Sequence, residues 1–473
     1  MYPAQTSLVP TQIALVRFLD QGGNILGAYP YWYLGTTPYR FLTGPVLPFS
    51  LTFLHRILPL NLFEIFFILI AASWLIGGGG VYWLVRELKG KKEAAFLAGL
   101  FYLFGPIMPF LFRFSNGLYL MAFSFLPFCL LFYSKLLKKW SRRKAVITAS
   151  LIAFEILLDS LILPTLVLGM GAVFLAQVGW KRVEERIKAS LGVLFSGWLV
   201  ATFWYTPSFW LTLLGAPSLA GKGLAGVIIS LGKILPASLA LGVAVFSVKF
   251  FKKRDLFRDF CFSWLFIFGC LSLLRFLSDP DFWLDWTAWG TELQFGLALG
   301  LGLITSSLFS NRKQSFAYLL LTACFLSFYL LFFGLVTNRF VLKTLQPEIF
   351  QTEEYQLGSQ LEKITKPGER VFLSGTTAFW LNAFFDLAQV RGGVDQASTD
   401  SKWRELTWQV REGTDPEKQL NLLKDLEVSY LVVHTQESAE FYHDFTYPEK
   451  FENQPGFEKI YDQKGDRVYR IGK

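Results

Sequence analysis

The sequence predicts a mainly α-helical membrane protein, a polytopic bundle of about ten spans followed by a small C-terminal α/β domain. Three observations predict this fold class. Hydrophobic residues make up 53% of the 473 residues and charged residues 17%, with a mean hydropathy of +0.39, whereas soluble domains carry about 25% charged residues. Apolar runs of about 20 residues, the length of a membrane-spanning helix, recur along the chain. After residue 337 the pattern changes to short alternating helices and strands.

Residues 1–60 are the first predicted domain, an extracytoplasmic loop region with an aromatic and proline-rich motif. A helical stretch, TSLVPTQIALVRFLDQGG, precedes the segment AYPYWYLGTTPYRFLTGPVLP. Prolines and glycines in this segment exclude regular structure. Its Tyr and Trp rings are suited either to the membrane interface or to a platform for a sugar ring or an isoprenyl tail.

Residues 61–337 are the second predicted domain, the transmembrane bundle. Its ten apolar segments are residues 62–85, 94–112, 117–137, 145–158, 161–180, 188–206, 225–248, 260–277, 288–310 and 315–336. Lys and Arg gather in alternate links, in five groups at residues 86–92, 135–144, 181–188, 249–258 and 312–313. The positive-inside rule assigns these groups to the cytoplasm, so the chain before residue 61 and after residue 340 is expected outside. Because ten spans put Met1 outside, we expect one further helix upstream.

Two features of the predicted spans stand apart from a plain apolar helix. The span at 145–158 is short, and Glu155 and Asp159 near its end share one helix face. We interpret them as carboxylates in water at the outer interface; the alternative is a functional role, because acids at membrane depth are rare. The run Gly77–Gly80 falls in the middle of a span, and we interpret it as a close helix-packing surface; the alternative is a hinge.

Residues 338–473 are the third predicted domain, an extracytoplasmic α/β domain with a net charge of −5, against +14 for the rest of the chain. A basic membrane part with an acidic tail does not indicate a nucleic-acid partner. The patterns predict helices at 353–364, 416–428 and 437–443, with Asp415 or Thr414 capping the second. They predict strands at 370–375 and 429–435, and a hairpin at 457–473 that turns at Lys464-Gly465-Asp466.

Metal and nucleotide motifs are missing from the sequence. His434 and His443 are nine residues apart with no Asp or Cys at ligand spacing, so we expect ordinary surface or strand-end residues and no metal site. The four cysteines lie in apolar runs and are expected to be free and buried. The segments LSGTT and RGGVD lack the spacing of phosphate-binding loops.

The chain as a whole resembles the GT-C superfamily of membrane glycosyltransferases, and most closely the YfhO-like bacterial membrane proteins. Its opening segment is similar to the family's first outer loop at Gly27, Pro30, Trp32, Gly35, Pro38 and Gly44-Pro45. The segments RELKGKKEAAFLAGLFYLFGPIMP and SNGLYLMAFSFLPFCLL resemble the loop and helices that follow. The end of the chain, LLKDLEVSYLVVH to VYRIG, is similar to the family's soluble tail.

The resemblance implies a multi-pass protein of the cell membrane that transfers a sugar from a polyprenyl-phosphate donor to an extracytoplasmic glycan or protein acceptor. Such a transfer needs a base for the acceptor hydroxyl and cations or donors for the released phosphate. A divalent cation is the one cofactor that this chemistry leaves open. The alternative is a non-catalytic relative that binds or transports a lipid-linked glycan. A secondary transporter fits less well, because the sequence shows no internal repeat.

The resemblance also implies a catalytic carboxylate in the first outer loop, where Asp20 is the first acid; Asp159 is the second candidate. Relatives tend to carry an Asp followed by a His earlier, where this chain has Ser7, Thr11 and Gln12. The candidate substrate-binding residues are Arg40, Arg113, Tyr31, Trp32, Tyr33 and Trp286. Arg40 is equally well explained as an arginine that snorkels to the interface. Near Trp286, where relatives often carry an Arg, this chain has Glu292 and Gln294.

Overall fold

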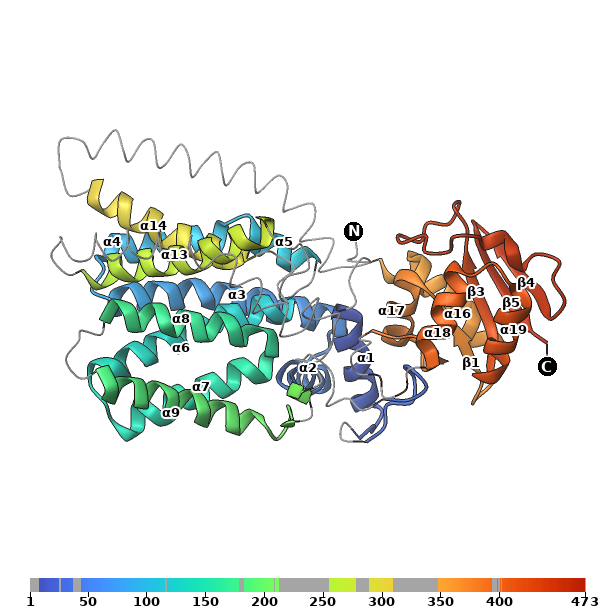
Figure 1. The fold of residues 1–473 in the computed structure, drawn as a ribbon, viewed down its shortest axis with the longest axis horizontal. Coiled ribbons are helices and arrows are strands. Elements are labelled where there is room, and N and C mark those ends of the chain that lie inside the picture. The colour runs from blue at the N-terminus through green and yellow to red at the C-terminus, as the bar shows by residue number, and fades with distance from the viewer. Residues whose placement is uncertain are drawn as a thin grey trace.

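A computed structural model describes the protein over residues 8–24, 27–36, 44–114, 117–177, 183–207, 209–211, 255–277, 289–308, 348–393, 398, 400 and 402–472. In this part of the chain a bundle of long helices is followed by an α/β domain (Figure 1). Two short helices, α1 (Leu8–Asp20) and α2 (Val46–Ile57), lie between them. The region 1–60 thus contains two helices in addition to its loop, and α2 begins directly after Gly44-Pro45.

From α3 to α9, the consecutive bundle helices are separated by short links. They are α3 (Leu62–Glu87), α4 (Lys92–Phe104), α5 (Ile107–Phe114), α6 (Gly117–Lys138), α7 (Arg142–Leu158), α8 (Leu163–Gln177), α9 (Val183–Ala201), α13 (Leu256–Leu277) and α14 (Gly290–Leu308). Two lysine- and arginine-rich links meet at one end of the bundle, where Lys138 at the end of α6 forms an ion pair of 2.7 Å with Glu87 at the end of α3. The helices α2 and α5 lie at the end that faces the C-terminal domain (Figure 1).

Four helical segments of the described chain are long and apolar enough to cross a membrane: Leu62–Glu87, Gly117–Lys138, Ser160–Gln177 and Leu256–Leu273. The predicted span 94–112 is divided into α4 and α5 by a break at Gly105-Pro106. The predicted spans 225–248 and 315–336 lie outside the described residues. The mainly helical membrane fold is therefore confirmed, and the count of ten spans stays a prediction.

The glycine run in α3 lies at a close helix crossing. A Cβ atom at Gly77 would come within 2.8 Å of the Tyr102 hydroxyl, and one at Gly80 within 2.6 Å of the Phe128 ring. Only a residue without a side chain lets α3 approach α4 and α6 this closely. The structure thus confirms the interpretation of this run as a packing surface.

The C-terminal domain is built on one mixed sheet of five strands in the order β2-β1-β3-β5-β4. Its elements are η3 (Ile349–Gln351), α16 (Glu353–Ile364), β1 (Arg370–Phe372), α17 (Gly375–Phe384), β2 (Ala388–Gln389), α18 (Lys402–Glu412), α19 (Pro416–Asp425), β3 (Val428–His434), η5 (Pro448–Phe451), β4 (Phe457–Gln463) and β5 (Asp466–Ile471). Strands β2, β1 and β3 are parallel, and β5 and β4 continue the sheet as an antiparallel hairpin.

Local signals account for the elements that the sequence predicts correctly. The hydroxyl of Thr352 accepts a hydrogen bond from the Tyr355 amide at the start of α16, and Asp415 caps α19 in the same way. The hairpin turns at Lys464 and Gly465, with φ values of 51° and 83°, as a tight turn between right-twisted strands requires.

The predicted helix at 437–443 is wrong, because this segment is an irregular loop. Its side chains bind backbone groups that a helix would use itself. One oxygen of the Glu440 carboxylate accepts hydrogen bonds from the amides of Tyr442 and His443. The other accepts from the Thr376 amide at 2.6 Å, so Glu440 caps the start of α17 from a distant part of the chain.

Candidate functional site

Asp20, the first catalytic candidate, is the last residue of α1 and contacts two side chains from α2. Its carboxylate lies 2.7 Å from Nδ1 of His55 and 3.3 Å from Nε of Arg56. Both partners come from the last turn of α2, so the pair joins the two short helices. The side chain of Asp20 is 19% exposed.

Asp159, the second candidate, and Glu155 are buried at the end of the bundle nearest α2. Their exposed fractions are 3% and 1%, so the interpretation that these carboxylates stand in water is wrong. Asp159 caps the short helix η2 (Ser160–Ile162), where Oδ1 accepts a hydrogen bond of 2.9 Å from the Leu161 amide. Neither carboxylate oxygen of Glu155 has a hydrogen-bond partner among the described residues. An unpaired acid in an apolar interior is costly, which is why such an acid marks a candidate site in a membrane protein.

A third buried acid, Glu292 in α14, has partners from two other helices. Its Oε1 accepts a hydrogen bond of 2.7 Å from the Thr165 hydroxyl in α8 and another from the Tyr119 hydroxyl in α6. In the sequence, Glu292 stands out only as a departure from the family pattern. Its partners lie 127 and 173 residues away in the chain, and no local pattern pairs them.

Gln294, two residues further along α14, occupies the break between α4 and α5. Its side-chain carbonyl accepts a hydrogen bond of 2.6 Å from the amide of Ile107. This amide begins α5 and has no partner within that helix. Gln294 therefore stabilises the interrupted helix beside the buried acids.

The two catalytic candidates do not share one site, because α2 separates them. The start of α2 touches the end of α7: a Cβ atom at Gly44 would overlap the carbonyl oxygen of Leu157, two residues before Asp159. Asp20 instead contacts the last turn of α2. Ten residues of helix between these contacts span about 15 Å. Asp159 and Glu155 thus form one group of acids, and Asp20 stands apart.

The aromatic loop binds the C-terminal domain. The indole N–H of Trp32 donates a hydrogen bond of 2.7 Å to the side-chain oxygen of Asn382, and the Tyr33 hydroxyl donates to the Gly392 carbonyl at 3.0 Å. The carbonyl of Tyr31 accepts from the amide of Gln389 in β2 at 2.9 Å. Trp32 and Tyr33 are 0% and 3% exposed, so protein atoms cover both rings. Figure 1 shows α1 beside α17 at this junction.

The substrate-binding role of these rings stays a prediction, as do the roles of the other candidates. Arg40 and Trp286 lie outside the described residues. Arg113 lies in α5, at the end of the bundle that faces the C-terminal domain, and its side chain is not described.

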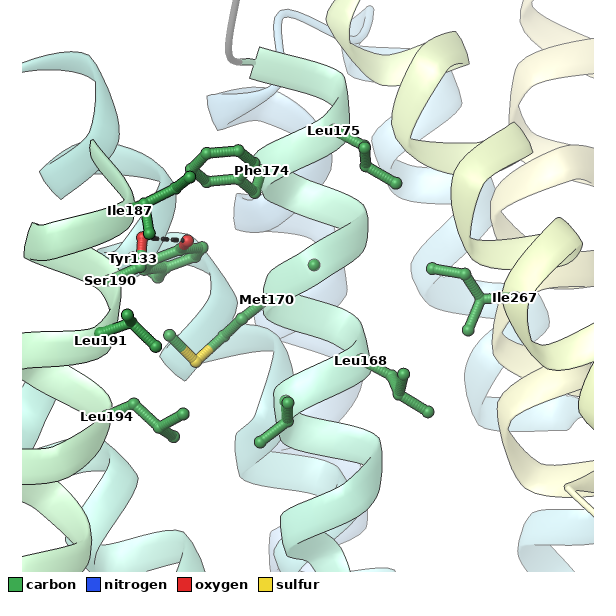
Figure 2. A pocket seen from close by; sticks show the side chains of 12 residues that line it. Tyr133, Leu168, Met170, Phe174, Leu175, Ile187, Ser190, Leu191, Leu194 and Ile267 are labelled. Atoms are coloured by element: carbon green, nitrogen blue, oxygen red, sulfur yellow. Dashed lines mark hydrogen bonds between the residues drawn. The ribbon is translucent and has the colours of Figure 1, made fainter. Parts of the chain in front are cut away.

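An apolar groove runs along α8 and α9 (Figure 2). Its volume is about 430 Å³, and its lining includes Met170, Phe174, Leu191 and Leu194. The one hydrogen bond drawn in it joins the Tyr133 and Ser190 hydroxyls at 2.7 Å. Ser160 lies beside the buried acids, and Met170 and Phe174 lie about 15–20 Å further along the same helical segment. The groove can therefore hold a hydrocarbon chain, and its Tyr133 and Ser190 hydroxyls are hydrogen-bonded to each other.

One group of potential metal ligands occurs in the described chain, and it lies in the C-terminal domain. Glu353, His434 and Asp466 each bring a ligand atom to within 4.8 Å of the other two. Burial, together with the adjacent carboxylate of Asp466, raises the pKa of Glu353 to about 8. His434 ends β3 as expected, but it is 1% exposed and therefore not a surface residue. Its acidic neighbours are distant in sequence, which is why ligand spacing missed them.

Solved structures of membrane glycosyltransferases share this fold. The apo oligosaccharyltransferase of Archaeoglobus fulgidus aligns with a TM-score of 0.56 and 13% identity, over 99% of this chain and 71% of the other. ArnT from Cupriavidus metallidurans aligns with a TM-score of 0.50 and 14% identity, over 99% and 93%. The mycobacterial arabinofuranosyltransferase AftD aligns with a TM-score of 0.59 and 16% identity, over 99% and 38%. No protein-family model matches the chain, and no curated protein sequence matches it. The chain therefore has the GT-C fold.

Proposed function

We propose that the protein is a membrane glycosyltransferase that moves a sugar from a polyprenyl-phosphate donor to a glycan or protein acceptor outside the cytoplasm. The observation that carries this proposal is a pair of buried acids, Asp159 and Glu155, at one end of a GT-C bundle. One of the similar structures is a complex of an archaeal oligosaccharyltransferase with an inhibitory peptide and a dolichol-phosphate. That complex supports a lipid-linked donor and an acceptor of this general kind.

Asp159 is the better candidate for the base that accepts the proton of the acceptor hydroxyl. A base needs a carboxylate that no cation already occupies. The carboxylate of Asp20 is held by His55 and Arg56, whereas the hydrogen bond to Asp159 comes from a backbone amide. Glu155, one helical turn earlier, adds a second acid near this position. Arg40 and Arg113 are the proposed partners of the donor phosphate.

The apolar groove supports a lipid-linked donor. A donor whose phosphate lay near Asp159 would extend its isoprenyl tail along α8. The groove begins at Val167 and Met170, about 10–15 Å along the helix from Ser160, the residue after Asp159. An apolar lining of this kind suits a hydrocarbon tail.

We propose that the chain is a YfhO-like bacterial protein that lies in the cell membrane with its C-terminal domain outside. The positive-inside rule supports this orientation, because the described Lys- and Arg-rich links at 86–92 and 135–144 lie at the opposite end from that domain. The acids would then act on the outer side, where a glycan or protein acceptor is found.

The proposal is tested with the purified protein in lipid vesicles and polyprenyl-phosphate-linked ¹⁴C-labelled sugars as donors. We expect label to pass to an acceptor glycan, and Asp159→Asn to lower turnover at least about 100-fold, the effect of losing a general base. Asp20→Asn should retain most of the activity. Glu184→Gln is the control, because that side chain is 82% exposed at the other end of the bundle.

The outcomes separate the proposed enzyme from the alternative. Unchanged turnover in Asp159→Asn would remove this residue as the base, and loss in Asp20→Asn alone would reverse our assignment. Saturable binding of the labelled donor with no transfer in any variant would favour the non-catalytic relative that binds or transports a lipid-linked glycan.

A further inference from the structure

The group Glu353, His434 and Asp466, which we call the carboxylate–histidine cluster, joins three separate segments of the C-terminal domain. Glu353 is the first residue of α16, His434 the last of β3 and Asp466 the first of β5. His434 and Asp466 are 1% and 5% exposed, while Glu353 is partly exposed and gives the cluster access to solvent. Three ligand atoms from three segments converge within 4.8 Å.

The hydrogen bonds around His434 place the proton of the neutral ring on Nε2 and leave Nδ1 without one. The hydroxyl of Thr377 donates to the Ser374 carbonyl at 2.7 Å, so it can only accept the hydrogen bond of 3.1 Å from Nε2 of His434. Nε2 therefore carries the ring proton. In the neutral ring, the lone pair of Nδ1 then faces Oδ1 of Asp466 at 2.8 Å. Two acceptors at this distance require either a proton or a metal ion between them.

Ser438 shows the same shortage of donors. Its hydroxyl lies 2.8 Å from Oε1 of Glu353 and 2.7 Å from Oδ1 of Asp466. A hydroxyl has a single proton and can donate to only one of these oxygens. The oxygen of Ser438 already accepts a hydrogen bond from the amide of Glu440 at 3.0 Å. Protons shared within the cluster or a metal ion must therefore lie between these acceptors, whose ligand atoms are within 4.8 Å of one another.

We propose that Glu353, His434 and Asp466 bind one divalent transition-metal ion of the Zn²⁺ class. A neutral imidazole and two carboxylates form a donor set that suits Zn²⁺, and Mg²⁺ or Ca²⁺ prefers oxygen ligands alone. Ligand atoms around a tetrahedral zinc ion at about 2.0 Å lie about 3.3 Å apart, so Nδ1 and Oδ1 need to separate by about half an ångström. Thr377 would hold the ring in the correct tautomer, and Ser438 would orient the carboxylates.

The bound ion would be a structural link within the C-terminal domain. It would tie α16, the first α-helix of the domain, to the neighbouring strands β3 and β5. Metal binding of this kind adds to folding stability, because the unfolded chain has no preformed site. The site goes beyond the proposed transfer reaction, whose acids lie in the bundle.

The test uses the full-length protein in detergent after dialysis against a chelator. We expect calorimetric titration to show one Zn²⁺ ion bound to each unmodified chain. In Glu353→Gln the affinity should be at least about 100-fold weaker, since even indirect neighbours of a metal change affinity about 10- to 100-fold. Zn²⁺ should raise the melting temperature of the unmodified protein, and Mg²⁺ should not. His443→Asn is the control, because it changes the other histidine of this domain and leaves the cluster intact.

A measurement on the unmodified protein keeps the proposal falsifiable if a variant fails to fold. Zinc K-edge X-ray absorption should show one imidazole nitrogen, oxygen ligands and no sulfur at the bound ion. Equal Zn²⁺ affinity in Glu353→Gln and the unmodified protein would overturn the proposal. So would an absence of zinc binding with an imidazolium signal from His434 in nuclear magnetic resonance, which would show that a proton fills the gap.

Discussion

Replacing Trp32 tests how firmly the aromatic loop is attached to the C-terminal domain. The ring is 0% exposed, and truncation of a buried Trp to Ala costs about 3–5 kcal/mol. The lost hydrogen bond adds little, because the side-chain oxygen of Asn382 also accepts one from Gln389 at 2.7 Å and stays paired. At 1.4 kcal/mol for each factor of ten, Trp32→Ala should raise local opening of the junction roughly 10²- to 4 × 10³-fold.

Hydrogen–deuterium exchange of residues 27–36 and 375–384 measures this opening directly. Trp32→Phe is the matched control: it keeps a large ring and removes only the indole N–H, so we expect an increase of about tenfold or less. If Phe opened the junction as much as Ala, the hydrogen bond rather than the ring would hold it. If Ala changed nothing, the loop would not be docked in solution, and our reasoning about the junction would fail.

Three further predictions concern the bundle and the C-terminal domain. Gly99→Ala should lower the melting temperature in detergent, because its Cβ would come within 2.8 Å of the Gly78 carbonyl, whereas Gly79→Ala, with nothing within 4 Å, should be neutral or stabilise by up to about 1 kcal/mol; equal effects would contradict the packing model. Glu155→Leu should raise the melting temperature, because it removes a buried carboxyl group without a hydrogen-bond partner in the described chain; a fall would indicate a polar partner for that carboxyl group. Burial lowers the pKa of Lys450 to about 8, so the unfolded chain holds more protons than the folded one between about pH 8 and 10.4. In thermal unfolding, the stability of the protein relative to Lys450→Met should therefore rise with pH over this range. A flat or falling stability difference would refute the lowered pKa.

Sequence patterns predicted elements whose causes are local. The helix at 353–364 has a Thr cap and an amphipathic face, and the hairpin has a Lys464-Gly465 turn, all within a few residues. The helix at 437–443 failed because Glu440 serves the start of α17, 64 residues away. The helix propensity of a short segment cannot reveal such a long-range contact.

The candidate site was less accessible to sequence reasoning for the same reason. Glu155 and Asp159 were noticed because acids are rare in apolar runs, but their burial depends on how the helices pack. The rings of Trp32 and Tyr33 were assigned to a membrane interface or a ligand, since the domain that covers them lies about 350 residues further along the chain. The carboxylate–histidine cluster combines residues from 353 to 466, which no spacing rule connects.

The pairing of Trp32 with Asn382 also sets the order in which the protein can be assembled. The two residues are 350 positions apart, and ribosomes add about 5–20 residues each second, so the loop is synthesised roughly 20–70 s before its partner exists. During that interval an apolar indole and its neighbouring tyrosines have no domain to cover them. Biogenesis must therefore shelter this segment, in the lipid surface or by a chaperone, until the last quarter of the polypeptide has been synthesised.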